Sequence, residues 1–437
     1  MTGQFGRAQQ RTTISRAGFL RLLGGATAAT AVPGLLAGCG GGSGSGDGKN
    51  LKMIGAGSQE AGLALALDQY KQQHPDVSIN LSFAPADQIQ TSVRAQLAAG
   101  NAPDLHAVYP GNGSAMSMVQ ISKAGLLADL SAQSWTQRIP TGFKGAYQND
   151  GKTYIFSPGT SVLGAVYNKK AFAAAGVEPP TTWSELIRVC ETLKRKGIVP
   201  IALGAQTPWV TQLINYALVP SKVYAKQPDF DDRMGAGTTS FAQSGWRDAM
   251  AAYLELQERG FFNDNPNGTT YEQSVSLVGT GKAGMAIQVS AVLDAFRKAA
   301  ASPDDIAMFP MPGSDVAAEN WIPGGIVVGI GVSAKSKGLE AAKSFVDFCA
   351  QPAIVGAWAK AAACVPLYAD GEPDVDPVLK PFMPYLAENK AVPFMDQRWP
   401  NAQVQPTHFA VVQELLGGRN TIEGALTKMD EAYRKAS

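Results

Sequence analysis

The sequence predicts an α/β fold organised as two lobes around a cleft, and two observations carry this prediction. The first is the order of two kinds of segment along the chain. Short segments that are apolar, or in which apolar and polar residues alternate, are each followed by a segment whose apolar residues recur every three to four positions. The first kind is typical of strands and the second of helices. The chain has 437 residues. Even without a short leader about 400 remain, which is more than one hydrophobic core usually organises.

Three strands open the folded part of the chain. They are expected at residues 51–54, 77–83 and 105–109, and the middle one alternates apolar and polar residues without a break. The helix between the last two strands is expected to begin at Asp87, with Gln90 three residues on in a capping-box-like start. This βαβαβ order predicts a parallel sheet with helices on both faces.

The rest of the chain follows the same pattern. Thr182 and Glu185 have the spacing of a capping box, and the helix that they begin is expected to end near Gly197. Further strands are expected at residues 200–203, 284–289, 306–309 and 326–332. Amphipathic helices are expected at residues 339–349 and 422–433.

Charge and cysteine content exclude some classes of protein. The 37 Lys and Arg residues nearly balance 36 Asp and Glu residues, so nothing attracts a phosphate backbone and we expect no nucleic-acid partner. No segment after the leader is long and apolar enough to cross a membrane. Besides Cys39 the chain has Cys190, Cys349 and Cys364, an odd number without metal-like spacing. Cys190 is expected to be a buried apolar residue, and a disulfide between Cys349 and Cys364 is left open.

The N-terminus has the composition of an export segment. Four arginines, without an acidic residue among them, precede an apolar run too short to span a bilayer comfortably, and this run ends in Leu36-Ala37-Gly38-Cys39. The ending matches the bacterial lipobox, in which the cysteine takes a diacylglyceryl group and becomes the new N-terminus. An ordinary signal peptide that contains a cysteine is the alternative.

The lipobox predicts where the mature chain begins and what holds it. We expect a signal peptide at residues 1–38, a Gly/Ser-rich tether at residues 39–49, and lipid attachment at Cys39 to the outer face of the cytoplasmic membrane. Ser15 to Arg21 looks like a twin-arginine export signal in which Ala17 replaces the second arginine. This departure leaves open whether export uses the twin-arginine or the general secretory route.

Three loops are expected to meet at one edge of the sheets. Residues 55–60, 110–114 and 288–291 each follow a strand, and ligands of open α/β sheets bind beyond the carboxyl ends of the strands. The loops lie far apart in the sequence, as a cleft between two lobes requires. The first two are rich in side-chain donors and acceptors, so they predict a neutral polar ligand.

Motifs of enzymes are sparse. A G-x-G-x-x-G match at residues 279–284 follows a helix and leads into a strand, the reverse of a nucleotide-binding loop, so we expect a simple turn. The three histidines form no zinc-like cluster, and neither H-E-x-x-H nor G-x-S-x-G occurs. We expect no enzymatic activity, no cofactor and no metal. A glycosidase-type carboxylate pair stays open, because the sequence singles out no pair.

Six of the seven tryptophans divide into two groups. Trp209, Trp321 and Trp399 lie in polar or Pro/Gly-flanked segments that read as loops, whereas Trp183, Trp246 and Trp358 fall on helical patterns and are expected in the core. A loop tryptophan offers a flat apolar face to a sugar ring, while neighbouring polar side chains bind its hydroxyls. The alternative is that each one packs beneath its own loop.

One long segment carries a resemblance to a known family. Residues 160–172, which include Tyr167-Asn168-Lys169, are followed by Gly176, Pro179-Pro180 and Thr182-Trp183. This order resembles the G-T…Y-N-K…G-x-x-x-P-P-x-T-W signature of bacterial extracellular solute-binding proteins of family 1, the maltose-binding-like carbohydrate receptors of ABC importers. Supporting stretches are residues 102–105, 281–286, 323–325 and 341–346.

The resemblance implies a type II periplasmic-binding-protein-like fold, with a hinge and an interlobe cleft. It implies a first lobe from residues 50–167 plus 310–350 and a second from 168–309 plus 351–437, with crossovers near 168–170, near 308–311 and within 333–350. By position in the family pattern, the ligand-binding residues would be Ser58, Gln59, Glu60, Tyr109, Asn112, Trp209, Gln288, Trp321, Arg398 and Trp399. Ala291 departs from the pattern, because maltose-binding relatives often have an aromatic residue there, which puts a maltodextrin-like ligand in doubt.

These features together predict a lipid-anchored, monomeric receptor that closes two lobes around a mono- or oligosaccharide and delivers it to the permease subunits of an ABC importer. A secreted carbohydrate-active enzyme is one alternative. The same fold with a non-sugar polar solute is the other, and a phosphorylated solute is disfavoured because Arg398 is the only cation in the expected set.

Overall fold

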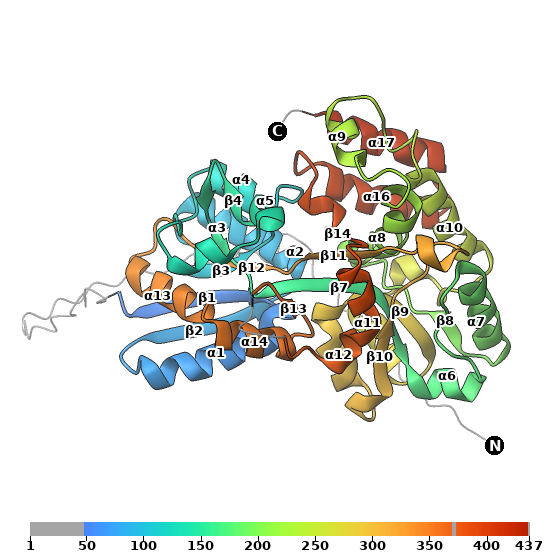
Figure 1. The fold of residues 1–437 in the computed structure, drawn as a ribbon, viewed down its shortest axis with the longest axis horizontal. Coiled ribbons are helices and arrows are strands. Elements are labelled where there is room, and N and C mark those ends of the chain that lie inside the picture. The colour runs from blue at the N-terminus through green and yellow to red at the C-terminus, as the bar shows by residue number, and fades with distance from the viewer. Residues whose placement is uncertain (1–47, 369–372, 436–437) are drawn as a thin grey trace, which may run out of the picture. The chain divides into compact units, whose positions relative to one another are not determined.

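The first of two main sheets contains the strands that open the folded chain (Figure 1). The computed structural model describes residues 48–368 and 373–435, and every structural statement below concerns these residues. The strand order is β2-β1-β3-β12-β6, with β1, β2 and β3 parallel and β12 and β6 antiparallel to their neighbours. The bounds are β1 (Asn50–Ala56), β2 (Ser78–Ala84), β3 (Leu105–Val108), β6 (Ile155–Phe156) and β12 (Gly329–Val332). The predicted parallel βαβαβ unit is therefore confirmed.

Helices lie on both faces of this sheet (Figure 1). On one face α1 packs against α14, and Tyr70 and Trp358 from these two helices are fully buried in the core beneath them. In Figure 1, α3, α4 and α5 lie on the opposite side of the sheet from α1 and α14. The other elements around this sheet are α13, which contacts both α1 and α14, and the small hairpin β4–β5. Bounds are α1 (Glu60–Gln73), α3 (Arg94–Ala99), α4 (Met118–Lys123), α5 (Lys144–Tyr147), β4 (Gln148–Asn149), β5 (Lys152–Thr153), α13 (Leu339–Cys349) and α14 (Pro352–Ala361).

The helix after β2 begins differently from the prediction. It runs through α2 (Ala86–Gln88), a π-helical turn at Ile89–Val93 and then α3, and its N-cap residue is Pro85, which has no side-chain cap. The predicted capping box at Asp87 is therefore wrong. Because Asp87 lies inside the first turn rather than before it, its carboxylate is free to face elsewhere.

The second sheet is built around one long strand, β7 (Gly159–Asn168). The order is β14-β11-β7-β9-β8, and β10 and β13 also pair with β7. β7 is antiparallel to β9, β10, β11 and β13, whereas β8 is parallel to β9. Bounds are β8 (Val199–Ile201), β9 (Ala283–Val289), β10 (Ile306–Phe309), β11 (Ile322–Ile326), β13 (Val365–Pro366) and β14 (Ala391–Val392).

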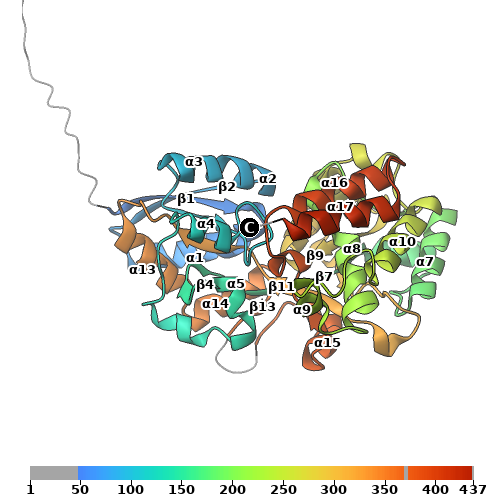
Figure 2. The ribbon, with the colours of Figure 1, turned by 90° about the horizontal axis from the view of Figure 1, so that it is seen from above.

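Most of the remaining helices surround this second sheet (Figures 1 and 2). The capping box at Thr182 and Glu185 is confirmed at the start of α7, whose C-cap is Lys196. The helices are α6 (Lys169–Ala175), α7 (Trp183–Arg195), α8 (Leu213–Val219), α9 (Phe230–Gly235), α10 (Trp246–Glu258), α11 (Tyr271–Gly279), α12 (Leu293–Ala299), α15 (Met383–Ala387), α16 (Val404–Leu416) and α17 (Ile422–Arg434).

The chain passes between the two sheets at three places that lie side by side. Residues 157–158 connect β6 to β7, Val327 and Val328 connect β11 to β12, and residues 362–364 connect α14 to β13. Val327 N–H donates to Gly159 O (3.1 Å) and Leu367 N–H donates to Pro158 O (3.1 Å), so the crossing segments are bonded to one another. Gly159 is required here, because a Cβ on it would lie 2.2 Å from Val365 O.

The crossing points differ from the expected ones. The expected strand at 326–332 is in fact two strands in two sheets, and β7 and β11 both belong to the second sheet although residues 50–167 and 310–350 were assigned to the first lobe. Conversely, α14 packs on the first sheet. No change of hydrophobic pattern marks the switch at Val327 and Val328, because both neighbouring strands are apolar.

Several predictions about the rest of the chain can be compared with the structure. The cysteines among the described residues, Cys190, Cys349 and Cys364, are all free and buried, so Cys349 and Cys364 form no disulfide. Within residues 48–368 and 373–435 no helix combines the length and the apolar character that a membrane span needs. The predicted signal peptide, Ala17, Cys39 and nearly all of the tether lie outside the described residues.

Candidate functional site

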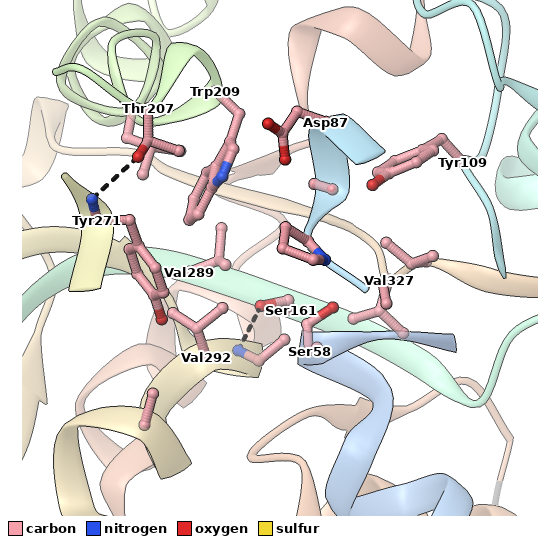
Figure 3. Close-up of a pocket in the computed structure, with 18 of the residues that line it drawn as sticks. Ser58, Asp87, Tyr109, Ser161, Thr207, Trp209, Tyr271, Val289, Val292 and Val327 are labelled. Carbon is pink, nitrogen blue, oxygen red and sulfur yellow. Dashed lines mark hydrogen bonds between the residues drawn. The ribbon is translucent and has the colours of Figure 1, made fainter. Parts of the chain in front are cut away.

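A cavity of about 790 Å³ opens between the two sheets. One side, which we call the first-sheet wall, is formed by Ser58, Glu60, Phe83, Asp87 and Tyr109. The other side, the second-sheet wall, is formed by Trp209, Tyr271, Val289, Asp396 and Gln397, and the crossing residues Val327 and Val328 line the cavity between them (Figure 3).

Strand ends place the residues of the first-sheet wall. Ser58 follows the carboxyl end of β1, and Tyr109 comes directly after β3. Phe83 is the last residue but one of β2, and Asp87 follows that strand. Parallel strands direct these ends to one edge of the sheet, as the sequence predicts. Gly55 allows a close approach there, because a Cβ on it would lie 2.9 Å from the Phe83 ring. Phe83 itself is 36% exposed.

Tyr109 is an unusual member of this wall. Its hydroxyl oxygen is buried and has no hydrogen-bond partner. Burial raises the pKa of the phenol above its ordinary value, and the nearby negative charges of Asp87 and Asp396 raise it further. A buried hydroxyl without a partner is costly, and in Figure 3 it points into the cavity. A ligand that reaches this hydroxyl would supply the missing hydrogen bond.

Packed aromatic rings form the second-sheet wall. The Trp209 and Tyr271 rings contact each other with centroids 5.1 Å apart. The Tyr271 backbone N–H donates to Thr207 Oγ1 (3.0 Å), which ties the start of α11 to the loop that carries Trp209 (Figure 3). Both rings also pack against the core of the second sheet. Packing therefore fixes the two rings in place, with flat apolar faces along the cavity.

Polar groups fix the base of the cavity. Ser161 Oγ accepts from the Ala291 N–H (3.1 Å) and is hydrogen-bonded to Ser290 Oγ (2.9 Å). The Gln397 side chain binds the Ile326 backbone on both sides, donating to its carbonyl (2.8 Å) and accepting from its N–H (3.2 Å). The turn that carries Gln397 is thereby attached to a crossing segment.

A close contact joins the two walls beside this turn. A Cβ on Gly113 would lie 2.0 Å from Asp396 O, and one on Gly111 would lie 2.3 Å from Gln397 O. Gly111 also has a φ of +73°, which other residues rarely adopt. The loop after β3 therefore needs glycine at both positions to pack on the Met395–Gln397 turn.

Two cations line the cavity, and each has an acidic partner. Arg297 donates to both oxygens of Asp376 (2.7 and 2.9 Å), and Lys298 Nζ lies 2.7 Å from Asp294 Oδ2. Burial by itself would raise the pKa of Asp376, but the hydrogen bonds from Arg297 and the Val378 N–H, together with the positive charges nearby, lower it. The cavity therefore offers no cation that is free of a carboxylate among the described residues.

Four of the predicted ligand-binding residues line the cavity: Ser58, Glu60, Tyr109 and Trp209. Ala291, noted as a departure from the family pattern, lines it as well. Of the three predicted loops, 55–60, 110–114 and 288–291, each contributes at least one lining residue. The structure therefore brings the three loops together, as strand order predicts.

Three other predicted residues near these loops serve the fold instead. Gln59 is 3% exposed; it accepts from the Ala56 N–H (3.0 Å) and donates to Val328 O (3.1 Å). Asn112 donates to Pro400 O and accepts from Gln120, outside the cavity lining. Gln288 is 1% exposed and does not line the cavity, because successive strand residues face opposite sides and Val289 takes the cavity side.

The last three predicted residues also lie outside the cavity lining. Trp399 is 4% exposed in the core of the second sheet, and Trp321 packs partly buried against the same core. Arg398 pairs with Asp231 (2.7 Å). The alternative that each tryptophan packs beneath its own loop is therefore the observed one for Trp321 and Trp399. Trp246 and Trp358 are buried and Trp183 packs on the core, as predicted.

Sequence reasoning missed several lining residues, among them Phe83, Asp87, Ser161, Tyr271, Asp396 and Gln397. Phe83 lies at the carboxyl end of β2 and Asp87 follows it, so the rule of strand ends would have found both if it had been applied to that strand. Ser161, Asp396 and Gln397 carried no local signal, because only the pairing of β7 and β11 brings them to the cavity.

Metal binding finds no support in the part of the chain that the structure describes. No group of three or more His, Cys, Asp or Glu residues there could hold a metal ion. His106 and His408 are fully buried, and burial lowers their pKa values to about 4 and about 3, so both are neutral.

A family model for bacterial extracellular solute-binding proteins matches residues 55–355. The chain belongs to this family. The match covers the cavity-forming loops from both sheets up to α14, and it agrees with the resemblance found in the sequence. Members are solute-binding receptors rather than enzymes, which decides against the enzymatic alternative.

Relatives with names that refer to sugars share much of the chain. The multiple sugar-binding protein of Streptococcus mutans is 24% identical over 299 residues, 66% of this chain and 68% of that one. A probable sugar-binding periplasmic protein of Brucella suis is 28% identical over 308 residues, 67% of this chain and 70% of that one. A solved chitin oligosaccharide binding protein has a TM-score of 0.72 at 24% identity, covering 88% of this chain and 98% of that one. This last likeness confirms the predicted two-lobe α/β fold.

Proposed function

We propose that the protein is a carbohydrate receptor of an ABC importer that binds its sugar in the cavity between the two sheets. The observation that supports the proposal is that an aromatic wall and a polar wall face each other across the cavity. The aromatic faces of Trp209 and Tyr271 suit the apolar face of a sugar ring, and Ser58 and the unpartnered hydroxyl of Tyr109 suit its hydroxyl groups. The names of the relatives support a sugar ligand.

We infer that the two sheets with their helices are the lobes that close on the ligand. The three crossing segments are short and hydrogen-bonded to one another, so they suit a hinge. A ligand that contacts both walls only in the closed state stabilises that state by the difference in binding free energy. Closure therefore gives the permease a signal that the receptor is loaded, without any chemical change in the ligand.

Binding to a sugar panel tests the proposal. The purified chain is titrated with mono- and oligosaccharides by calorimetry, and a change in tryptophan fluorescence that is lost in Trp209→Phe reports contact with the ligand. We expect at least one sugar to bind with a micromolar or lower dissociation constant and to raise the unfolding temperature, since a ligand at about 100 times its Kd contributes about 2.7 kcal/mol. Absence of binding across the panel, or binding of a non-sugar polar solute alone, would contradict the proposal.

We also propose that a lipid on Cys39 holds the receptor at the outer face of the cytoplasmic membrane as a monomer. The lipobox and the Gly/Ser-rich residues after it support this placement. In the bacterial host, Cys39→Ala is expected to move the protein from the membrane fraction to the medium or periplasm. Retention of the variant in the membrane would show that another segment anchors it.

A further inference from the structure

The Asp396 carboxylate is partly buried and has no cationic partner among the described residues. It lies in the short turn Met395–Gln397, lines the cavity and is only partly exposed. Its Oδ1 accepts from Tyr216 Oη (3.0 Å), but it forms no ion pair with any Lys, Arg or His among the described residues. Burial raises its pKa to about 6, although the bond from Tyr216 acts in the opposite direction. A sheltered carboxylate without a cation is unfavourable.

The facing wall presents a second carboxylate and a free hydroxyl. Asp87 lines the cavity from the first turn of the helix after β2, and Tyr109 Oη is buried without a partner. In Figure 3 the Asp87 carboxylate and the Tyr109 hydroxyl both point into the cavity. On the other wall Asp396 lines the same cavity, and its backbone packs against Gly113, four residues after Tyr109. We call Asp87, Tyr109 and Asp396 the acidic corner, and the negative charges of its two carboxylates add to the effect of burial in raising the pKa of the Tyr109 phenol.

The described residues provide nothing that neutralises the acidic corner. Arg297 and Lys298, the cations of the cavity, are paired with Asp376 and Asp294. Arg94, from the same helix as Asp87, lines an adjoining groove rather than the cavity. The corner keeps two carboxylates and one unpartnered oxygen, all of which accept hydrogen bonds when the acids are ionised.

We propose that the ligand carries a protonated amine that binds in the acidic corner, so that the cavity selects an amino sugar over a neutral or an acidic one. The inference rests on the proposed carbohydrate function and narrows it. The ammonium group would donate to Asp87 and Tyr109 from one wall and to Asp396 from the other. Since it reaches both walls only when they approach, the charge also favours closure.

Matched oligosaccharides test the choice of ligand. Trimers of glucosamine, of N-acetylglucosamine and of galacturonic acid are titrated into the purified chain by calorimetry, with putrescine as an amine that has no sugar ring. We expect the glucosamine trimer to bind about tenfold tighter than the acetylated trimer, and the uronate to bind most weakly. Equal or weaker binding of the amine would overturn the inference while leaving the carbohydrate function intact. Binding of putrescine with no sugar bound would contradict the carbohydrate function instead.

Single substitutions locate the effect. Asp396→Asn and Asp87→Asn are each expected to weaken the glucosamine trimer about tenfold and to change the acetylated trimer by less than about twofold. Asp68→Asn, an exposed change on α1 outside the cavity, serves as the charge-matched control and should alter neither. An unchanged amine affinity in both cavity variants would overturn the inference. Asp87 is exposed, so its variant tests the proposal even if Asp396→Asn fails to fold.

The pH dependence of amine binding distinguishes a direct contact with Asp396 from a purely structural role of this residue. Asp396 is largely protonated at about pH 5 and gains charge through about pH 6, where the amine of a glucosamine unit is still mostly protonated. Nearer pH 7 that amine loses protons, because the neighbouring ring oxygens make it a weaker base than an alkylamine. Amine affinity should therefore rise from about pH 5 to about pH 6 and then level off or fall, neutral-sugar affinity should stay level, and the rise should disappear in Asp396→Asn. The neighbouring titratable groups change little in this interval: Tyr109 and Tyr216 have raised pKa values, and the pKa of His408, which stacks on Tyr216, is about 3. A level profile for the amine would overturn the role of Asp396.

Discussion

The two walls of the cavity are built by different means. Trp209 and Tyr271 of the second-sheet wall pack on each other and on a core, so their positions are set before a ligand arrives. The first-sheet wall consists of side chains at strand ends, where Phe83 is 36% exposed and the Tyr109 hydroxyl lacks a partner. We therefore expect the second-sheet wall to provide most of the binding free energy, and the first-sheet wall to add smaller polar contributions when the two lobes close.

Removal of the aromatic face should have the largest effect on binding. Trp209→Ala is expected to weaken sugar binding by about 2 kcal/mol, roughly 30-fold, because the sugar loses its flat apolar contact. Calorimetry of the variant measures the loss. Trp321→Ala is the matched control, since Trp321 also packs partly buried on the second-sheet core but does not line the cavity. Equal losses in both variants would mean that the tryptophans act through folding, and the proposed difference between the walls would fail.

Removal of the free hydroxyl should have an intermediate effect. Tyr109→Phe is expected to weaken binding by about 1 kcal/mol, roughly fivefold, because the ligand loses one hydrogen bond. Its free energy of unfolding should not fall, since the hydroxyl has no partner in the protein to lose. Denaturant unfolding checks the second expectation. A large loss of stability would show that the hydroxyl has a partner in solution and is not waiting for a ligand.

The smallest effect is expected at the loop after β1, where two neighbouring residues separate binding from folding. Ser58→Ala should weaken binding by only about 0.5 kcal/mol, roughly twofold, with stability unchanged. Gln59→Ala should lower the free energy of unfolding by about 1–3 kcal/mol, because it leaves the Ala56 N–H and two backbone carbonyls without their buried partner. Titrations below the unfolding temperature should then show near-normal affinity. The reverse pattern would exchange the roles assigned to Ser58 and Gln59.

The tryptophans show where a local pattern stops being informative. Trp209, Trp321 and Trp399 all have polar or Pro/Gly neighbours in the sequence, yet only Trp209 lines the cavity. Pro208 begins a short helix that presents Trp209 toward Tyr271, whereas Trp399 is enclosed by Tyr216, Phe241 and His408. Tyr216 and Phe241 lie 183 and 158 residues before Trp399 in the chain, so no short window of sequence around a tryptophan could separate the cases.

Four features could be predicted from the residues alone: the α/β class, the parallel strands that open the first sheet, the capping of α7, and the meeting of three loops at one edge. These features depend on hydrophobic period and strand direction, which a short stretch of chain already contains. Three features could not be predicted and became visible in the folded chain: where it crosses between sheets, which of two neighbouring residues faces the cavity, and that Asp87, Tyr109 and Asp396 line one cavity. These three features depend on how segments that are distant in the sequence pair and pack. The free energy of such contacts cannot be read from the residues on either side of one segment.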